Sequence, residues 1–561
     1  MLSSHFQALI ALLSLGGAAN VQQQKPVLGV GVSSNSYITS DFDSFVKDTL
    51  EEYHVPGLSL AIVDGDNIST KGYGIAKFPD QEVTADTLFF TGSTTKAFTA
   101  ATVAQLVHDE SYPDLTWKTP IVNFLREDFV LEDEHATLHT TIEDALSHRT
   151  GMPRHDLSYG RGENETVSSI VKRMRYLPLT YAPRTQYQYC NLMFAVMTDL
   201  VETVTGVEQG KLTIDKIWKP LGMHSTTYDL DSVLADSEAF IAQGYYWTPN
   251  RTYIAEPYLN LLPIAGAGAT ISSINDYSLW AKALLDAANP NKPMNKSSPI
   301  TRHIWHDVTR PRTIMIEADE TTINSPLYAL GWVTQEILGR TVVWHNGGLD
   351  GFGTELYLVP ELGFGIATMG NTAGSSNVAG KVILSRLLAN KLGAAEDAET
   401  SVRDMLVRGF DIVPSWKQRM SAYHEEYHDT KLPLPGPIEK FAGQYRHPGY
   451  GSIEFKALSS NSLQGLFATH IWPTRLDLNH LTDSVFAVNI SHPHGIGDLE
   501  DTSEASGVIW SLDDSGQAAF KFSLDGETVE KLGMQLEPKM VEATEGNAKR
   551  WQEGMIWFEK L

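Results

Sequence analysis

One short segment of the chain combines residue types that could perform nucleophilic catalysis. In TGSTTKAFTAATVAQLV (91–107) the only charged residue is Lys96, and a helix is expected to begin near Ser93. Every side of this helix is apolar or small, which is typical of a buried helix, and burial lowers the pKa of an unpaired lysine. At spacing i, i+3 the two side chains share a face, so a neutral lysine could remove the serine proton. Alternatively, Ser93 only caps the helix and Lys96 extends to the surface.

A second segment, YQYCNLMFAVMTDLVETVTG (187–206), presents two polar side chains just before a helix. Helical spacing begins at Leu192 and is expected to end at Gly206, which leaves Tyr189 and Asn191 on the preceding turn. Being two residues apart, they point to the same side of an extended turn, where a phenol can pass a proton and a carboxamide can bind a carbonyl or amide group. The alternative is a tyrosine packed by its ring beside an asparagine N-cap.

A third polar group ends a strand predicted late in the chain. In RTVVWHNGG (340–348), His345 stands directly before Asn346, Gly347 and Gly348. A lone histidine at such a place is commonly a hydrogen-bonded structural residue. The paired glycines favour a functional role, because they let a ligand approach the backbone of the strand closely.

The expected framework around these residues is a sheet with helices. Helical periodicity covers 42–53, and GLSLAIVDGDNISTKGYGIA (57–76) is typical of two antiparallel strands joined at Asp64–Gly65. Further strands are predicted at 328–337, 340–348, 354–360 and 363–371, followed by a helix at 377–393.

The region before these late strands contains a glycine-rich segment. AGAGA (265–269) precedes a helix whose N-cap we assign to Asn275, and residues 286–325 are predicted to be an exposed insertion. No lysine follows the glycines and no G-x-G-x-x-G follows a strand, so a nucleotide-binding loop is not predicted. We expect neither a cofactor nor a metal.

The last 126 residues differ in pattern from the rest. The acidic, mixed-charge stretch 396–435 is interpreted as a helical linker that ends in KLPLPGP (431–437). From 436 to 561, short alternating segments such as GSIEFKA and SVFAVNI predict a small all-β domain, either a barrel or a curled sheet.

Size and charge limit the classes of partner. A chain of 561 residues is long enough for a large core and more than one domain. The formal net charge of −25 repels phosphate backbones and anionic membranes, so nucleic acid is not expected as a partner. A small-molecule substrate is expected instead. The sequence leaves the oligomeric state open.

The N-terminus indicates secretion. An apolar run from Ala8 to Leu15 followed by small residues to Ala19 predicts a signal peptide over 1–19, although no Lys or Arg precedes the run. No later stretch is long and apolar enough to span a bilayer. The single cysteine, Cys190, allows no internal disulfide. Glycosylation sequons occur at Asn67, Asn164, Asn250, Asn295 and Asn489.

Three motifs in this order resemble a known family. Ser93-Thr94-Thr95-Lys96, Tyr189-Cys190-Asn191 and His345-Asn346-Gly347 are similar to the motifs of the serine β-lactamases and penicillin-binding-protein-like hydrolases. The segments HVPGLSLAIV, LSHRTGMPRHD, IWKPLGMHSTTYD and YALGWVTQ are similar to those of the branch with class C β-lactamases, D-aminopeptidases and related esterases. The resemblance covers roughly residues 38–395, and the terminal β unit resembles the lipocalin-like domains appended to several such hydrolases.

The resemblance implies a fold and a set of roles. The fold would be α/β of the α+β type, with one antiparallel sheet built from early and late strands, flanking helices and a helical subdomain. Ser93 would be the acylated nucleophile, and Lys96 and Tyr189 would share its proton. Asn191 would bind the substrate, as would the His345-Asn346-Gly347 segment. The backbone N–H groups of Ser93 and Gly348 would form the oxyanion hole.

One departure bears on the substrate. Where penicillin-recognising members have Lys-Thr-Gly, this chain has His-Asn-Gly, and His345, mostly neutral at pH 7, would bind a substrate carboxylate weakly. Neutral esters or amides are therefore favoured over β-lactams and cell-wall peptides. We expect a secreted serine hydrolase. The alternatives are an acyltransferase that uses the same acyl-enzyme and a catalytically inactive binding protein of the same fold.

Overall fold

The computed structural model describes residues 37–161, 165–293, 295, 297–315, 325–394, 396–408, 425, 431–499, 508–544 and 551–561. The chain divides into two compact units, Met1–Tyr37 and Ile38–Leu561, and all helices and strands below belong to the second unit. The predicted signal peptide at 1–19 and the sequon at Asn164 lie outside the described residues.

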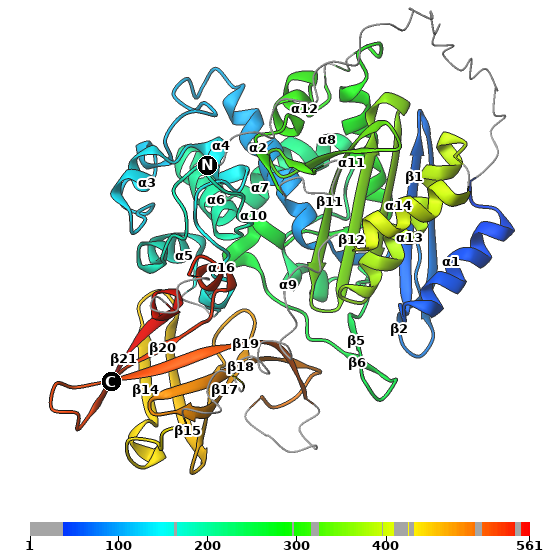
Figure 1. Ribbon diagram of the computed structural model, residues 1–561. Helices are drawn as coiled ribbons and strands as arrows, with labels where there is room; N and C mark the ends of the chain where they lie inside the picture. Colours follow the sequence, from blue (N-terminus) through cyan, green and yellow to red (C-terminus); the bar gives the residue numbers. More distant parts are fainter. Residues whose placement is uncertain are drawn as a thin grey trace, which may run out of the picture. The chain divides into compact units, whose positions relative to one another are not determined.

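One antiparallel sheet joins strands from the two ends of the hydrolase part. Among the described residues it has nine strands, in the order β3-β2-β1-β13-β12-β11-β10-β9-β8 (Figure 1). β13 pairs with β1 from Leu58 to Asp64. The strands are β1 (Gly57–Asp64), β2 (Asn67–Lys77), β3 (Gln81–Glu82), β8 (Thr313–Ile314), β9 (Leu327–Tyr328), β10 (Val333–Ile337), β11 (Arg340–Leu349), β12 (Phe352–Val359) and β13 (Phe364–Gly370). The expectation of one sheet built from early and late strands is confirmed.

Helices cover both faces of the central strands. α11 (Ile274–Ala288) packs on β1 and β13, whereas α13 (Ser375–Leu392) packs on β12 and β13. α1 (Ser40–Glu52) and α14 (Glu396–Arg408) lie on the same side as α13 (Figure 1). Because both faces are covered, every residue of β12 and β13 is buried. This burial agrees with the mostly apolar sequence of the two strands, in which Thr354, Glu355 and Thr368 are the buried polar residues.

The remaining helices form the helical part that holds two of the three motifs. α2 (Thr95–Val107) is surrounded by α6 (Leu192–Thr205), α7 (Gln209–Thr213), α10 (Ala265–Gly268) and α12 (Arg302–Thr309), and nearly all of its residues are buried. α6 begins at Leu192 and ends at Gly206, whose left-handed φ of 69° stops the helix. Shorter helices in this part are α3 (Glu134–His139), α4 (Ile142–Leu146), α5 (Val167–Arg173), α8 (Lys219–Leu221) and α9 (Leu230–Ala235).

Two local expectations were wrong. The N-cap of α11 is Ser273, whose hydroxyl accepts a hydrogen bond from the Asp276 N–H, and not Asn275. Asn275 is turned outward, where its side chain bonds Asp86 and Thr70. The stretch 286–325 is not simply an exposed insertion, because α12 buries Ile304 and Val308 against α2 and α11. Residues 316–324 lie outside the description.

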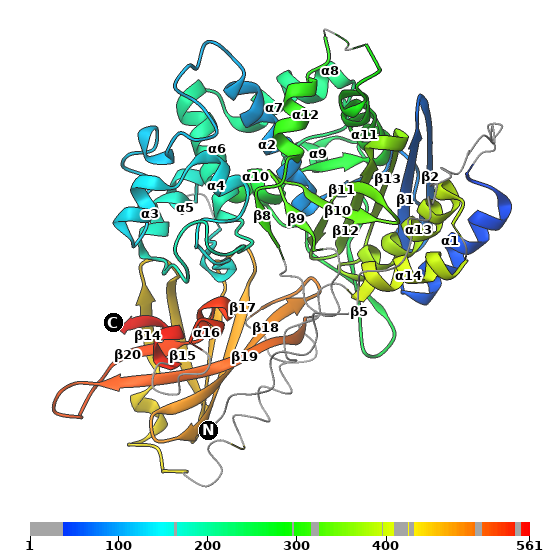
Figure 2. The same cartoon turned by 45° about the horizontal axis from the view of Figure 1, so that its top comes forward.

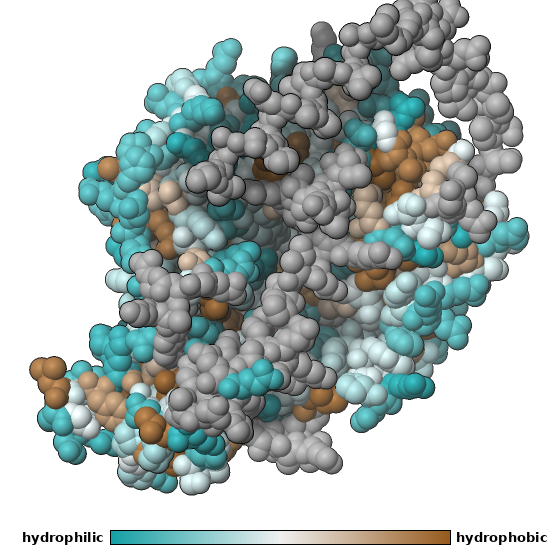
Figure 3. All heavy atoms as spheres, in the orientation of Figure 1, coloured by the Kyte–Doolittle hydropathy of each residue, from teal (hydrophilic) through white to brown (hydrophobic). Residues whose placement is uncertain are grey.

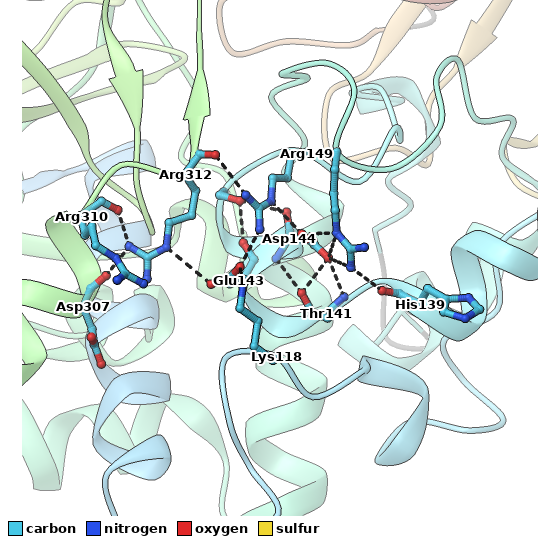
Figure 4. Close-up of polar contacts among 11 residues, drawn as sticks. Lys118, His139, Thr141, Glu143, Asp144, Arg149, Asp307, Arg310 and Arg312 are labelled. Carbon is cyan, nitrogen blue, oxygen red and sulfur yellow. Dashed lines mark hydrogen bonds and ion pairs between the residues drawn. The ribbon is translucent and has the colours of Figure 1, made fainter.

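Two carboxylates on α4 anchor the loops that lead to the candidate site (Figure 4). Buried Asp144 accepts hydrogen bonds from Arg149 Nε at 2.7 Å and Arg184 Nη2 at 2.7 Å. Its neighbour Glu143 binds Arg149, Lys118 and Arg312. The Arg184 N–H also donates to the Arg149 carbonyl. The loop after α4 and the loop before α6 are therefore tied together by ion pairs.

The C-terminal region is a closed barrel, as the all-β expectation allowed. Its strands are β14 (Gly443–His447), β15 (Gly451–Ser459), β16 (Ser462–Phe467), β17 (Thr474–Thr482), β18 (Val485–His494), β19 (Ile509–Phe522), β20 (Val529–Met534) and β21 (Ile556–Lys560), drawn from yellow to red in Figure 2. Its interior is filled by packed aromatic rings, including Phe441, Tyr445, Phe486 and Phe520.

The face of the molecule drawn in Figure 3 is mostly hydrophilic where residues are described, and hydrophobic colour there forms separate patches. No helix in the described residues is long and apolar enough to cross a membrane. The segment 396–408, expected within a linker, is the helix α14 packed on α13, whereas most of 409–430 lies outside the description.

Candidate active site

Ser93 lies in a tight turn directly before the buried helix α2. The turn, Gly92–Thr94, is a single 3-10 turn and α2 continues from Thr95. Gly92 has φ +51°, and a Cβ atom there would lie 2.9 Å from the Gly348 nitrogen. Glycine is therefore required at 92 by both backbone conformation and space. The Ser93 side chain caps neither the turn nor α2, which leaves its hydroxyl available for chemistry.

Lys96 is fully buried and does not extend to the surface. Its Nζ lies 3.1 Å from Ser93 Oγ, 2.8 Å from Asn191 Oδ1 and 2.8 Å from the Ala267 carbonyl oxygen. The latter two oxygens can only accept, so they fix two N–H bonds of the amine. The tetrahedral position of Nζ that is left over faces Ser93. A neutral Lys96 directs its lone pair at the serine hydroxyl.

The electrostatic surroundings favour that neutral form. Desolvation is the largest cause that holds the pKa of Lys96 well below its ordinary value, and the positive charge of Arg154 acts in the same direction. Asp156 opposes this shift. The Asp156 carboxylate is hydrogen-bonded to Arg154, whereas the Lys96 amine bonds Ser93, Asn191 and Ala267. Lys96 therefore has the properties of a general base for Ser93.

Tyr189 completes the group around Lys96. The amine lies 4.7 Å from the centre of the Tyr189 ring, and the ring packs on buried His148 with ring centres 4.3 Å apart. Desolvation raises the pKa of the Tyr189 phenol, while its hydrogen bond with Ser93 and the charge of Arg154 oppose the rise. The phenol thus interacts electrostatically with the hydroxyl that the amine contacts. Asn191 makes no capping bond to α6, so its carboxamide holds Lys96 and Asp156.

The glycines of β11 lie at an uncovered edge of the sheet beside Ser93. β10 pairs with β11 only from Arg340 to Trp344, so the segment from His345 to Leu349 is next to the Gly92–Thr94 turn instead of a strand. The two-residue turn between β11 and β12 follows the pair Leu349–Phe352. From this pair onward, hydrogen-bonded and non-hydrogen-bonded pairs alternate along the two strands, and Gly348 with Gly353 is a non-hydrogen-bonded pair. The Gly348 N–H therefore points away from β12, toward Ser93. Gly348 is exposed, and it lines the cavity described below.

The other residues of this motif are placed behind the cavity. His345 is 3 % exposed, with Nε2 2.9 Å from the Tyr328 hydroxyl and Nδ1 2.6 Å from the Asn346 carbonyl oxygen. Desolvation and the nearby Lys96 lower the pKa of His345 to about 3, so the ring is neutral. Gly347 is buried, and a Cβ atom there would lie 2.0 Å from the Thr91 carbonyl oxygen. The structure therefore brings Ser93, Lys96, Tyr189, Asn191 and Gly348 together, whereas His345, Asn346 and Gly347 do not line the cavity.

Sequence reasoning missed Arg154 and Asp156. Arg154 Nε lies 2.5 Å from Asp156 Oδ2, and the guanidinium lies over the Tyr189 ring with its central carbon 5.1 Å from the ring centre. Both residues line the cavity. Their segment, LSHRTGMPRHD, was noted for its similarity to the family, and the adjacent opposite charges in it were the available signal.

A cavity of about 560 Å³ opens in front of Ser93. One wall comes from the hydrolase part and the other from the barrel. The lining includes Ser93, Arg154, Asp156, Asn191, Leu261, Ile264 and Gly348 on the first side, and Trp472, Ile490, His492, His494, Asp514 and Leu536 on the second. The barrel thus borders the space where a substrate would bind.

The barrel also holds the loop that carries Arg154 and Asp156. His155, between them, has a left-handed φ of 48°. Its N–H donates to Glu537 Oε2 at 2.8 Å and its Nδ1 lies 2.7 Å from the Tyr450 hydroxyl. A non-glycine residue in this conformation needs such support, because the conformation is unfavourable for an L-residue.

Comparison with protein families agrees with this geometry. The family model named Beta-lactamase matches residues 42–390. The chain belongs to the beta-lactamase family. It is a serine hydrolase of that family, and the matched residues contain all three motifs.

Two curated relatives extend the comparison beyond the hydrolase part. The chain is 42% identical over 431 residues to Unguisins hydrolase ungD' of Aspergillus campestris (strain IBT 28561), covering 75% of this chain and 78% of the relative. It is 37% identical over 435 residues to Unguisins hydrolase ungD of Aspergillus violaceofuscus (strain CBS 115571), covering 74% and 76%. Among solved structures, the octameric penicillin-binding protein homologue from Pyrococcus abyssi aligns with a TM-score of 0.55 and 18% identity, over 88% of this chain and 97% of that chain. This last likeness concerns the fold alone.

Proposed function

We propose that the chain hydrolyses small ester or amide substrates through an acyl-enzyme on Ser93. The observation that carries the proposal is the 3.1 Å contact between Ser93 Oγ and the buried Lys96 Nζ, at the wall of a cavity. Two groups can take the serine proton: the amine, which contacts this hydroxyl, and the Tyr189 phenol, whose pKa the Ser93 hydroxyl lowers.

The proposed reaction follows from the position of each group. Ser93 Oγ attacks the substrate carbonyl carbon while its proton passes to the Lys96–Tyr189 pair. The N–H groups of Ser93 and Gly348 stabilise the oxyanion. Its collapse breaks the bond to the alcohol or amine, which takes the proton and leaves. Water then attacks the acyl carbon and loses a proton to the same pair. The bond from this carbon to Ser93 Oγ breaks, the pair returns the proton to Oγ, and the carboxylic acid leaves.

The charges of the cavity favour neutral substrates. The motif that carries lysine in penicillin-recognising relatives offers a buried, neutral His345 here. Arg154, the only lysine or arginine among the cavity-lining residues described, is paired with Asp156. Because two similar relatives are named as hydrolases of unguisins, we propose unguisins as the first natural compounds to test.

The test is covalent labelling followed by turnover. A fluorophosphonate probe should label the unmodified protein at Ser93, as mapped by mass spectrometry, and Ser93→Ala should abolish labelling without loss of folding. Ser385→Ala changes another buried serine, on α13, and serves as the matched control. Labelling that persists in Ser93→Ala, or that maps elsewhere, would overturn the assignment. p-Nitrophenyl esters, D-amino-acid amides and unguisins should then be assayed for turnover.

Two finer proposals concern the acceptor and the location of the protein. We propose water as the acceptor, since the similar relatives are named hydrolases, and products formed with added alcohols or amines would show acyl transfer instead. We propose secretion with cleavage after about Ala19, to be tested by N-terminal sequencing of protein from culture medium. Asn67, Asn250 and Asn295 are exposed and suitable for glycosylation, whereas the side-chain oxygen of Asn489 is buried in the barrel.

A further inference from the structure

A buried carboxamide lies directly behind the glycine segment of β11. Asn377 is on α13 and is 8% exposed. Its Nδ2 donates to the Gly347 carbonyl oxygen at 3.0 Å, to the Thr354 carbonyl oxygen at 3.1 Å and to Glu355 Oε1 at 2.9 Å. One amide group therefore contacts both strands at the end of the sheet that borders Ser93.

The carbonyl that Asn377 binds belongs to the same peptide unit as the Gly348 N–H. A trans peptide is planar, and its C=O and N–H point in opposite directions. A group that fixes the Gly347 carbonyl therefore also fixes the Gly348 N–H. By the register of β11 and β12, that N–H points away from β12, toward the Gly92–Thr94 turn.

This peptide unit is held by a strand on one side only, where Gly347 pairs with Thr354 of β12, and Asn377 adds a further bond to the Gly347 carbonyl. It joins two glycines, which have the largest conformational freedom of all residues, and it has no partner strand on the side of Ser93. A hydrogen bond to the carbonyl limits rotation of the peptide plane. The same bond polarises the peptide and strengthens its N–H as a donor.

The surroundings of Asn377 are shaped to keep its amide group in place. A Cβ atom at Gly353 would lie 2.5 Å from Asn377 Oδ1, so only glycine leaves room for the carboxamide at this depth. Its third acceptor, Glu355, is 1% exposed and lies on β12. Asn377 is thus held by a buried carboxyl group on one side and aimed at the glycine strand on the other.

We propose that Asn377 is a positioning residue of the oxyanion hole, which holds the Gly347 carbonyl from behind β11 and thereby aims the Gly348 N–H at the substrate carbonyl oxygen. The inference rests on the proposed acyl-enzyme at Ser93. Asn377 touches no substrate itself, so its effect passes entirely through the peptide between Gly347 and Gly348.

The experiment compares Asn377→Ala and Asn377→Ser with a matched control, Asn371→Ala. Asn371 is also buried and bridges strands, by accepting from the Gly57 N–H at 2.8 Å and donating to the Ile75 carbonyl, but it does not contact β11. Active sites are counted with the fluorophosphonate probe. The measurements are kcat and KM for a p-nitrophenyl ester and the inhibition constant of an arylboronic acid, whose serine adduct places a hydroxyl group in the oxyanion hole.

Asn377→Ala should lower kcat per active site by roughly 10- to 100-fold and weaken boronate binding to a similar degree, with KM changed by less than about threefold. Asn377→Ser keeps a short donor, so its kcat and boronate affinity should lie between those of Asn377→Ala and those of the unmodified protein. Asn371→Ala should lose thermal stability but keep kcat and boronate affinity. Equal losses in the Asn371 and Asn377 variants, or normal kcat in folded Asn377→Ala or Asn377→Ser, would overturn the inference. Failure of the unmodified protein to label at Ser93 would instead overturn the proposed function on which the inference rests.

Discussion

The Arg154 guanidinium lies over the ring of Tyr189, with its central carbon 5.1 Å from the ring centre. Its positive charge lowers the pKa of both Tyr189 and Lys96, whereas Asp156, to which it is bonded, raises both. The groups packed around the phenol from other elements are His148 and His345, both neutral because burial lowers the pKa of each ring. Arg154 is thus the positive charge at the mouth of the site that acts on the proton-accepting pair.

Removing that charge should move the pH dependence of acylation. In Arg154→Met the pKa of the pair rises, so acylation at pH 6 should fall by roughly three- to tenfold while the rate near pH 9 changes little. Arg154→Lys keeps a positive charge and should keep the profile. The rate of fluorophosphonate labelling from pH 5 to 9 measures this. A uniform loss at all pH values would mean that Arg154 acts by packing or substrate contact alone.

Lys96 and Tyr189 should act as one unit and not independently. The amine contacts the Ser93 hydroxyl and lies 4.7 Å from the centre of the Tyr189 ring, so removal of either group should interrupt the same proton transfer. Lys96→Ala and Tyr189→Phe should each cost roughly 10²- to 10⁴-fold in acylation rate, and the double variant should be little worse than the poorer single one. Losses that multiply in the double variant would show separate roles. Near-normal turnover by Tyr189→Phe would leave Lys96 as the sole base.

Ester hydrolysis should exceed cephalosporin hydrolysis in the unmodified protein. His345 is buried and neutral, with both ring nitrogens engaged by Tyr328 and the Asn346 carbonyl, so it offers no cation to a β-lactam carboxylate. Comparison of kcat/KM for a p-nitrophenyl ester and a chromogenic cephalosporin checks this, and efficient cephalosporin turnover would contradict it. His345→Lys should be unstable, because it adds a second amine to the buried surroundings of Lys96.

The ion pairs of α4 should contribute both to the unfolding free energy and to the rate of acylation at the candidate site. Asp144→Asn removes the carboxylate that binds Arg149 and Arg184 in a fully buried position, so we expect a loss of about 3 kcal/mol of unfolding free energy, with slower acylation. Asp215→Asn, which breaks an exposed pair with Lys219, should leave the unfolding free energy nearly unchanged. Denaturant unfolding of the two variants measures the difference. Equal losses would show that burial of the pair is unimportant.

Local sequence patterns predicted the elements that hold the site better than they predicted the site itself. The buried helix after Ser93 and the helix stop at Gly206 follow from periodicity and glycine geometry, and both were expected correctly. Lys96 and Asn191 are 95 positions apart, and their contact depends on the tertiary fold. It could be predicted only through resemblance to a family. The same holds for Arg154 over Tyr189 and for Asn377 behind Gly347. These contacts join loops and helices that no local pattern links.

The placement of His345 shows a further limit. The strand end and the glycines were predicted, but not which side of β11 the ring occupies. That side is set by Tyr328 on β9, whose hydroxyl donates a hydrogen bond to Nε2 within the buried layer, since Nδ1 donates to the Asn346 carbonyl. The pairing of two such groups depends on strand order, which the sequence alone does not specify.

Glu355, the acceptor of Asn377, should make stability depend on pH. Desolvation raises its pKa from 4.5 to about 7, so below pH 7 the folded protein keeps a proton that the unfolded chain releases above pH 4.5. The resulting stabilisation is complete below pH 4.5 and is lost as the pH rises through 7, a change of roughly 3 kcal/mol. Glu355→Gln cannot ionise, so its stability relative to the unmodified protein should rise by about that amount between pH 4.5 and 8. Chemical denaturation at several pH values measures it, with Glu336→Gln on the exposed side of β10 as the control. A stability difference that stays constant over this range would show that Glu355 is already ionised in the folded protein at low pH.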